Sequence, residues 1–408
     1  MVFFVSAVSD LDYLHAVAHR VVDAARVMPG ETIEGGGKNT TGVVLRVPGG
    51  TRNYYPAFWV RDAAMMLGSD LVPADELRGW IKVIMSVQAG PSGLAFDHGL
   101  VIPPYSIPDH ITLDGRACWF PGAYADQGVG NYGHLPPADD AFFFVGMVAE
   151  LRRLGETPTP EMVDAAKRAF ESVETDSATG LVVCSEDPAR DRVDWGFCDS
   201  IKKSGLCLMP SLLRWQAAKQ LSRLTGLRSF GKVADQIRSS VVSTFLQPVD
   251  GRESLLLSAT GVGRKDDVWA GAFAVWLHLL PRPIELKVAR HLLNLYLHGD
   301  VAAEGQFLEV PPRGEFGGHW EKAGSGPKDY QNGGYWATPT GWYVAALREV
   351  DRPTADKLLG EYVRFLRENE AKGASFEWIN PMTGVMRNPL YGSSAGLVYT
   401  ALAVAGSH

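Results

Sequence analysis

The chain has 408 residues, of which 46% are hydrophobic and 21% are charged, so it can bury a large core. Its formal net charge of −7, from 39 basic and 46 acidic side chains, argues against a nucleic-acid or anionic-membrane partner. No Gly/Ser tract, Pro-rich spacer or charge block divides the sequence, so we expect a single domain over residues 1–408.

Apolar residues that recur at spacings of three and four predict about a dozen helices. Residues 9–28 are typical, because Leu14, Val17 and Val21 fall on one face. The other predicted helices span 58–70, 74–88, 138–154, 159–173, 208–224, 228–246, 267–280, 284–297, 336–349, 353–369 and 392–405. Pro and Gly punctuate many of their ends, as at Pro73 and Gly155, which supports these boundaries.

Strand signals are few. Residues 41–49 and 179–185 are predicted to be short hairpin pieces within loops. Long loops rich in Gly, Pro and aromatic residues are predicted at 91–137, 186–206, 303–335 and 372–391. Loops of that length without regular structure are uncommon unless they have a function.

The number of helices predicts an all-α fold built from six helical hairpins. An inner ring of helices inside an outer ring, the (α/α)6 toroid, would bury both apolar stripes and leave loops with short β-hairpins to line a pocket at one end. No sequence repeat marks the hairpins. A helical solenoid is the competing architecture, but its short, regular repeat loops are absent.

The four cysteines, Cys118, Cys184, Cys198 and Cys207, are too irregularly spaced for a disulfide framework or a structural zinc site. The N-terminal MVFFVSAVSD lacks the basic start and long apolar run of a signal peptide. No stretch approaches the roughly 20 apolar residues of a membrane span. We therefore expect a reduced, cytoplasmic protein without a metal or cofactor.

Four loop-to-helix junctions are dense in polar and aromatic residues. They are 54–62, which ends in Arg61 and Asp62; Asp139 with Asp140; 194–205; and the pair 330–336 and 376–384. Helix capping or the helix dipole would explain the first two equally well. In the last, Glu377 lies between two aromatic residues, so it is either hydrogen-bonded scaffolding or a catalytic group.

Together these segments resemble the (α/α)6-barrel glycosidases, a group that includes glucoamylases, trehalases, neutral invertases, processing α-glucosidases and the glucosidase domain of debranching enzymes. Residues 59–62 (WVRD) are similar to the family's W-x-R-D signature, whose Arg and Asp hold hydroxyls of the −1 sugar. Asp140 resembles the D-A/S entry to an inner helix. The motifs occur in the family's order over residues 54–396.

The resemblance also implies the catalytic pair. Residues 198–205 (CDSIKKSG) look like the family segment that carries the general acid, here Asp199. Residues 376–384 (FEWINPMTG) are close to E-x-x-N-P-x-T-G, whose Glu, here Glu377, is the general base. Residues 330–336 (YQNGGYW) match Y-H/Q-N-G-x-x-W, although Ala337 stands where the family has Pro. Ser200 and Ile201 also depart from the small or basic residues usual there.

The expected function is inverting, exo-acting hydrolysis of a small α-linked glucoside or oligosaccharide. One protonated carboxyl donates to the leaving oxygen, while a carboxylate roughly 6.5–9.5 Å away activates water. Burial near Trp195 and Phe197 would raise the pKa of the acid. Asp194 is the rival acid. Lys202 and Lys203 would oppose a raised pKa, so we expect them to point away or to contact the leaving group.

Other residues are expected to bind a small carbohydrate. The proposed substrate-binding set is Trp59, Arg61, Asp62, Asp140, Asp194, Trp195, Gln331, Asn332 and Trp336. Further candidates are Asp97, His98 and 124–126 as lining, Glu304, Glu309, Glu315 and Glu321 as alternative bases, and 314–326 as a lid. Stacking of sugars on aromatic faces suits a chain with 11 Trp, 13 Tyr and 17 Phe.

Three alternatives stay open at this stage. An inverting sugar phosphorylase would replace the water-activating carboxylate with a phosphate site. A sugar epimerase would want paired histidines on inner helices, which the ten scattered histidines do not suggest. A non-catalytic sugar-binding barrel would have lost one of the two carboxylates, yet both are present.

Overall fold

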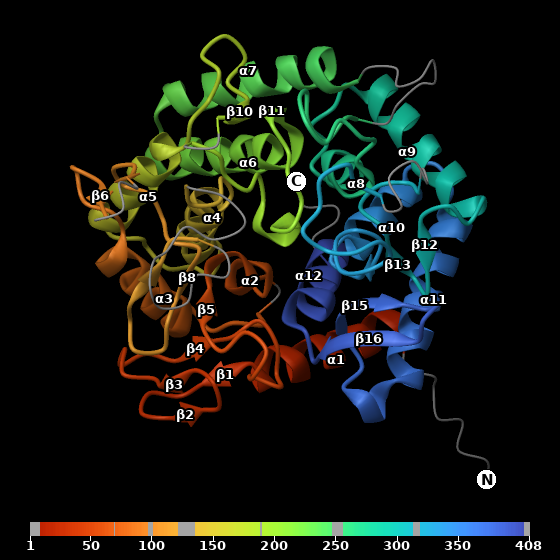
Figure 1. Cartoon of the computed structure of the whole chain (residues 1–408), viewed down its shortest axis with the longest axis horizontal. Helices are drawn as coiled ribbons and strands as arrows, with labels where there is room; N and C mark the ends of the chain where they lie inside the picture. The colour runs from red at the N-terminus through yellow and green to blue at the C-terminus, as the bar shows by residue number, and fades with distance from the viewer. Residues whose placement is uncertain are drawn as a thin grey trace.

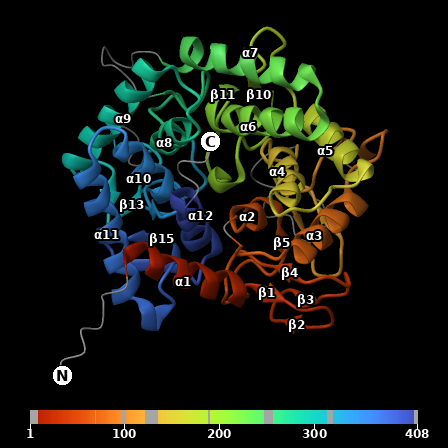
Figure 2. The same ribbon diagram turned by 180° about the vertical axis from the view of Figure 1, so that it is seen from behind.

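The structure, a computed structural model, describes residues 9–68, 70–96, 101–120, 135–187, 190–246, 256–312 and 319–403. Within these ranges the even-numbered helices form a closed inner ring in which each contacts the next (Figures 1 and 2). They are α2 (Val60–Met65), α4 (Asp140–Arg153), α6 (Leu208–Thr225), α8 (Val268–Trp276), α10 (Thr340–Arg348) and α12 (Gly392–Ala403).

The odd-numbered helices pack outside this ring. They are α1 (Asp10–Ala24), α3 (Ala74–Val87), α5 (Pro160–Ser172), α7 (Arg228–Phe245), α9 (Arg282–Leu297) and α11 (Arg352–Glu368). Helix α1 packs on α12, α3 and α5 on α4, α7 on α6, α9 on α8, and α11 on α10. Six inner helices surrounded by six outer helices in the described ranges confirm the predicted (α/α)6 toroid.

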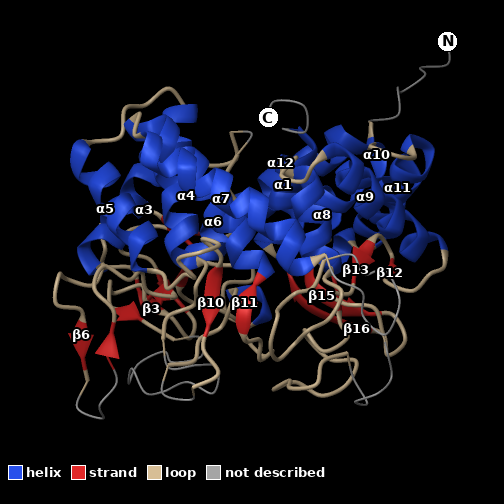
Figure 3. Ribbon diagram, turned by 90° about the horizontal axis from the view of Figure 1, so that it is seen from above, coloured by secondary structure: helices blue, strands red, loops and turns tan. Residues whose placement is uncertain are grey.

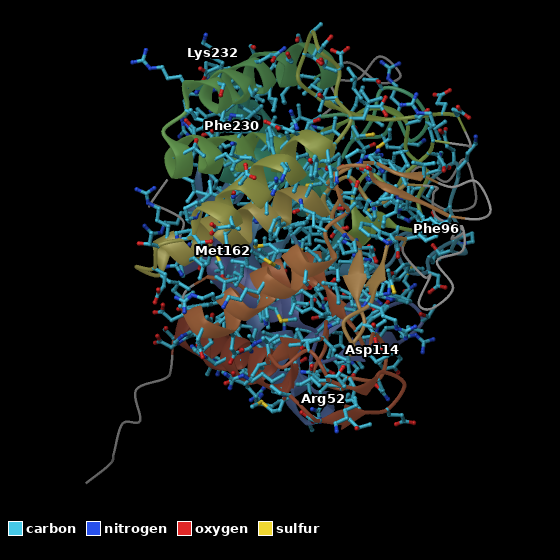
Figure 4. All side chains as sticks on the ribbon, turned by 90° about the vertical axis from the view of Figure 1, so that its left-hand side faces the viewer. Arg52, Phe96, Asp114, Met162, Phe230 and Lys232 are labelled. Carbon is cyan, nitrogen blue, oxygen red and sulfur yellow. The ribbon has the colours of Figure 1, made fainter. Side chains whose placement is uncertain are left out.

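The two rings differ in sequence because they differ in burial. In the inner helix α8 every residue from Val268 to Val275 is buried, as expected of a helix covered on all sides. The outer helices have one apolar face only. In α7, for example, Phe230 lies under the helix while Lys232 points into solvent (Figure 4). None of the helices in the described ranges is long and apolar enough to cross a membrane.

Short strands gather at one end of the helical rings (Figure 3). The largest sheet is antiparallel, with the order β12 (Ala302–Ala303), β13 (Gln306–Phe307), β14 (Tyr335–Trp336), β15 (Phe376–Asn380) and β16 (Val385–Pro389). A second sheet joins β5 (Phe58–Trp59), β8 (His110–Ile111) and β9 (Ala117–Cys118). The remaining pairs are β1 (Arg26–Val27) with β4 (Leu45–Arg46), β2 (Thr32–Ile33) with β3 (Gly37–Lys38), β6 (Leu94–Ala95) with β7 (Val101–Ile102), and β10 (Val182–Cys184) with β11 (Gly205–Cys207).

These sheets correct several sequence-based expectations. The predicted loop 372–391 contains the hairpin β15–β16, and the predicted loop 303–335 contains β12 and β13. The helix expected from residue 336 begins only at Thr340, because Trp336 is held in β14 opposite Phe307 and Trp378. Strand β14 pairs with segments far away in sequence, β12 and β13 have only two residues each, and β15 is buried on both faces. None of them therefore shows the alternation by which a strand is predicted.

The helix ends were also overestimated near the N-terminus. The predicted helix 58–70 starts with strand β5 and ends at Met65. The predicted helix 9–28 ends at Ala24, because Arg26 and Val27 pair with β4. The strand piece expected at 41–49 contains β4, whose partner is β1 at the end of the first helix. Likewise, the piece expected at 179–185 pairs with β11.

Candidate active site

Asp199 and Glu377 line one pocket at the strand end of the inner ring. Asp199 directly follows the short 3-10 helix η1 (Gly196–Cys198), and Glu377 is the second residue of β15. The rest of the described lining is Pro48, Tyr55, Trp59, Arg61, Asp62, Gly196, Phe197, Tyr330, Trp336 and Tyr391. Two acidic residues that are remote in sequence are thus brought to a common cavity.

A clamp formed by Gln331 positions the loop that carries Asp199. The Gln331 side-chain amide donates to Oδ1 of Asp199 at 2.9 Å and to the carbonyl of Phe197. Its Oε1 accepts the backbone N–H of Ser200 at 2.8 Å and the Ser200 hydroxyl. Burial raises the pKa of Asp199 to about 6, although the bond from Gln331 acts in the opposite direction. The carboxyl therefore holds its proton into the weakly acidic range.

Glu377 is almost completely buried, and donors reach both of its oxygens. The Tyr55 hydroxyl donates to Oε1 at 3.0 Å, and the Asn388 amide donates to Oε2. Burial raises the pKa of Glu377 to about 8, and the nearby carboxylate of Asp62 adds to this, while the Tyr55 hydrogen bond lowers it. The pKa of Glu377 is thus above that of Asp199, although the hydrogen bonds from Tyr55 and Asn388 favour the ionised form of Glu377.

Arg61 organises the floor of the pocket through three aspartates. Its Nη2 pairs with Asp109, and with Oδ2 of Asp140 at 3.3 Å, while its Nε lies 3.3 Å from Oδ2 of Asp139. All four side chains are buried. Asp139 occupies the N-cap position of α4 but makes no capping hydrogen bond there. The aspartates therefore bind Arg61 instead of capping the helix.

Gly196 connects this network to the loop of Asp199. Its backbone N–H donates to Oδ2 of Asp139 at 3.0 Å. A Cβ atom at position 196 would lie 1.8 Å from the guanidinium carbon of Arg61, so only glycine allows the backbone to pack on this group.

Asp62 lies beside the two candidate catalytic carboxylates. The Tyr391 hydroxyl donates to its Oδ1 at 2.9 Å, and burial raises the pKa of Asp62 to about 7. The pocket thus holds three carboxyl groups, Asp62, Asp199 and Glu377, against a single described cation, Arg61, which is already paired. Such a cavity disfavours a strongly anionic ligand.

Aromatic side chains form the walls. Trp59 stacks on His110 with ring centres 4.1 Å apart and meets Tyr55 edge-on. Trp336 contacts Tyr330 and Phe197. Trp195 does not line the described pocket but packs behind Phe197.

Several predicted residues lie outside the described lining. Asp194 pairs with Nζ of Lys203 at 3.3 Å, and Lys203 also binds Glu309 at 2.8 Å, all of them buried. Lys202 instead binds Asp191 at 2.6 Å. Lys203 therefore binds both the rival acid, Asp194, and an alternative base, Glu309. Neither Lys202 nor Lys203 is part of the described lining.

The other candidates have structural partners or cannot be placed. Asn332 does not line the pocket and accepts the backbone N–H groups of His319 and Trp320. Glu321 accepts the N–H of Gly263, and Glu304 pairs with Arg364. Asp97, His98, 124–126, Glu315 and residues 314–318 of the expected lid lie outside the described residues.

Four residues of the site, Tyr55, Tyr391, Asn388 and Asp109, were not among the predicted site residues. Tyr55 and Tyr391 stand inside or beside motif segments, so a closer look at polar aromatic residues there could have found them. Asp109 and Asn388 follow no motif, and only the fold reveals their contacts with Arg61 and Glu377.

The fold has several relatives among solved structures. A rhamnosidase from Klebsiella oxytoca with rhamnose bound is similar over 98% of this chain, at a TM-score of 0.57 and 14% identity, and the chain spans 65% of that protein. A GH63 mannosylglycerate hydrolase from Thermus thermophilus in complex with glucose is similar over 95% of this chain and 99% of its own, at a TM-score of 0.57 and 13% identity. The chain has the fold of the six-hairpin glycosidases.

A glycosidase variant in complex with glucose is similar as well, with a TM-score of 0.53 and 14% identity over 96% of this chain and 97% of its own. By sequence, no family model matches the chain and no curated protein matches it. The likeness therefore concerns the fold.

Proposed function

We propose that this protein is an inverting, exo-acting glycoside hydrolase in which Asp199 is the general acid and Glu377 the general base. The observation that supports this most strongly is the shared pocket: the buried carboxyl group of Glu377 and the partly buried one of Asp199, which come from different elements, line a cavity with aromatic walls. Inverting hydrolysis needs such a pair on either side of one sugar ring.

The hydrogen bonds favour this division of roles. Both oxygens of Glu377 accept from neutral donors, Tyr55 and Asn388. These bonds oppose the burial that raises its pKa and so favour the carboxylate form that takes a proton from water. Asp199 accepts side-chain hydrogen bonds from Gln331 and Tyr330, yet burial keeps its pKa at about 6, so it can hold the proton that the leaving oxygen requires. In this proposal Arg61, Asp62, Trp59 and Trp336 surround the sugar, with Gln331 as a positioning residue.

Charge favours hydrolysis over phosphorolysis. A phosphorylase must bind a phosphate anion beside the sugar, but the described lining has three carboxyl groups and one arginine that three aspartates already bind. Water, the alternative nucleophile, is neutral. We therefore place the protein among hydrolases and expect phosphate to have no effect on turnover.

The experiment begins with a substrate panel. Because the related structures hold rhamnose or glucose and one is a mannosylglycerate hydrolase, the panel contains α-glucosides, α-rhamnosides and mannosylglycerate, each with and without inorganic phosphate. Proton NMR of the first product then reports the anomer released. Release of the anomer opposite to that of the substrate is expected. Retention, or turnover that requires phosphate, would contradict the proposal.

Substitutions test the roles. Asp199→Asn and Glu377→Gln are each expected to lower kcat by about 10²- to 10⁴-fold while sugar binding, measured by calorimetry, is kept. Asp194→Asn is the matched control, because it removes an acid of the same loop that does not line the described pocket. Unchanged turnover in Asp199→Asn, with a loss in Asp194→Asn at equal folded fraction, would transfer the acid role to Asp194.

A further inference from the structure

A second cavity, of about 730 Å³, lies on the axis of the helical rings. All six inner helices contribute to it or to its rim, including Phe143 and Gly146 of α4, Leu213 of α6 and Trp342 of α10. Its volume is within the range of roughly 300–1,000 Å³ typical of small-molecule sites. It is separate from the pocket of Asp199 and Glu377, with which it shares no lining residue.

The wall of this axial cavity is mainly apolar. It is lined by Ala64, Met65, Leu67, Phe142, Phe143, Leu213, Phe273, Trp276, Trp342 and Leu397, among others. Apolar cavities are poor sites for water and take up apolar ligands. An alkyl chain in the cavity would make van der Waals contacts with wall atoms that have no protein neighbour on that side.

Gly146 enlarges the cavity at a cost to the helix. It lies in the interior of α4, where glycine is less favourable than alanine by about 1 kcal/mol. A Cβ atom there would meet nothing closer than Oε1 of Gln220, at 3.9 Å. No close contact therefore demands glycine at this position, and its effect is to widen the space.

A few polar groups line the apolar space. The side-chain amides of Gln216 and Gln220, which are half-buried, border it. The indole N–H of Trp342 is buried and has no hydrogen-bond partner among the described residues. Buried polar groups normally have partners, so the Trp342 N–H, beside the two amides, indicates a ligand with polar atoms as well as an apolar body.

The rim is basic. Arg152 and Arg153 stand in the last turn of α4, and Arg223 stands in the last turn of α6. Glu150 binds Arg153 with both oxygens at 2.7 Å. Arg152 donates to the carbonyl of Arg223 at 3.0 Å, and in the described ranges no carboxylate pairs with Arg152 or Arg223. Two positive charges are thus available to an anion at the rim.

From this combination we propose that the axial cavity binds an amphipathic carboxylate, with its alkyl chain along the axis and its carboxylate at Arg152 and Arg223. From Phe143 to Arg152 the helix rises by roughly 13 Å, which suits an alkyl chain of medium length. Decanoate is the probe. The proposal does not rest on the glycosidase activity, because its site and its assay are separate.

The test measures decanoate binding to the full chain by calorimetry, and by the fluorescence of the tryptophans that line the cavity. Saturable binding at one site is expected. Gly146→Leu fills the cavity and should weaken binding at least about tenfold, whereas Gly231→Leu, a matched change in α7 away from the cavity, should leave it unchanged. Arg223→Gln should weaken decanoate binding by about tenfold and leave binding of decanol unchanged.

Two results would overturn the proposal. The first is the absence of saturable decanoate binding by the full chain. The second is equal binding by the Gly146→Leu variant, with its fold verified by circular dichroism.

Discussion

Replacing Tyr55 by Phe tests whether Glu377 acts as the base. The Tyr55 hydroxyl donates to Oε1 of Glu377 at 3.0 Å and lowers the pKa of that carboxyl, which stands at about 8. A hydrogen bond to a charged group contributes about 1.5–3 kcal/mol, and one pKa unit corresponds to about 1.36 kcal/mol. Tyr55→Phe should therefore raise the pKa of Glu377 by about one to two units.

The sign of the effect on rate follows from the role of Glu377. With pKa values of about 6 for Asp199 and about 8 for Glu377, the form with Asp199 protonated and Glu377 ionised is a constant minor fraction between those pH values. Raising the pKa of Glu377 makes this form about 10- to 100-fold rarer. The plateau of kcat/KM should fall by that factor, while its alkaline limb moves up by one to two pH units.

The assay is kcat/KM against pH from 4 to 10 on the best substrate of the panel. If Glu377 were the acid, raising its pKa would move the alkaline limb without lowering the plateau, so an unchanged plateau would refute the assigned roles. Tyr343→Phe is the control: it removes a buried tyrosine hydroxyl that donates to the carbonyl of Leu292 and does not line the pocket. The two limbs of its pH profile should stay in place. The profile reports the pair of carboxyls together, which is why the change between variants is compared.

Three further predictions concern stability. Gly196→Ala should lower the free energy of unfolding by about 1–3 kcal/mol, since its Cβ would overlap the guanidinium of Arg61; a melting temperature equal to wild type would contradict this packing. Lys203→Met leaves buried carboxylates without their cation and should cost about 3–5 kcal/mol, measured by denaturant unfolding. Because the pKa of Glu377 is raised to about 8, its stabilising neutral form is fully present below pH 4 and is lost as the pH rises through 8. Glu377→Gln should therefore melt above wild type at pH 9 and close to it at pH 4, and the same difference at both values would refute the shift.

The sequence predicted the helices well because helical periodicity is local. In the outer helices one apolar face repeats every three to four residues, and inner helices such as α8 are apolar throughout, so both are visible without tertiary information. Thr159 before α5 and Asp351 before α11 are capping residues followed by proline, and they mark helix starts equally locally.

The carboxylate pair was predicted by motif resemblance, and the contacts around it were not. Asp199 and Glu377 were chosen from short segments, and the structure places both on one pocket. By contrast, Asp194 was expected to bind substrate or to act as the acid, yet it pairs with Lys203 outside the described lining. Asp194 and Asp199 lie in one loop and look equivalent in sequence. Only the tertiary contacts of each show which one lines the pocket.

The sequence by itself determined the ring of helix pairs, because the apolar pattern of each helix is a local property of its own residues. Only the tertiary structure decided the sheet that carries Glu377, the aspartates that hold Arg61, and the space along the axis. Each of these depends on groups far apart in the chain, such as Asp109 with Arg61 or Trp336 with Trp378. Pairings of that kind leave no periodicity in any one segment, so they become visible only after the chain has folded.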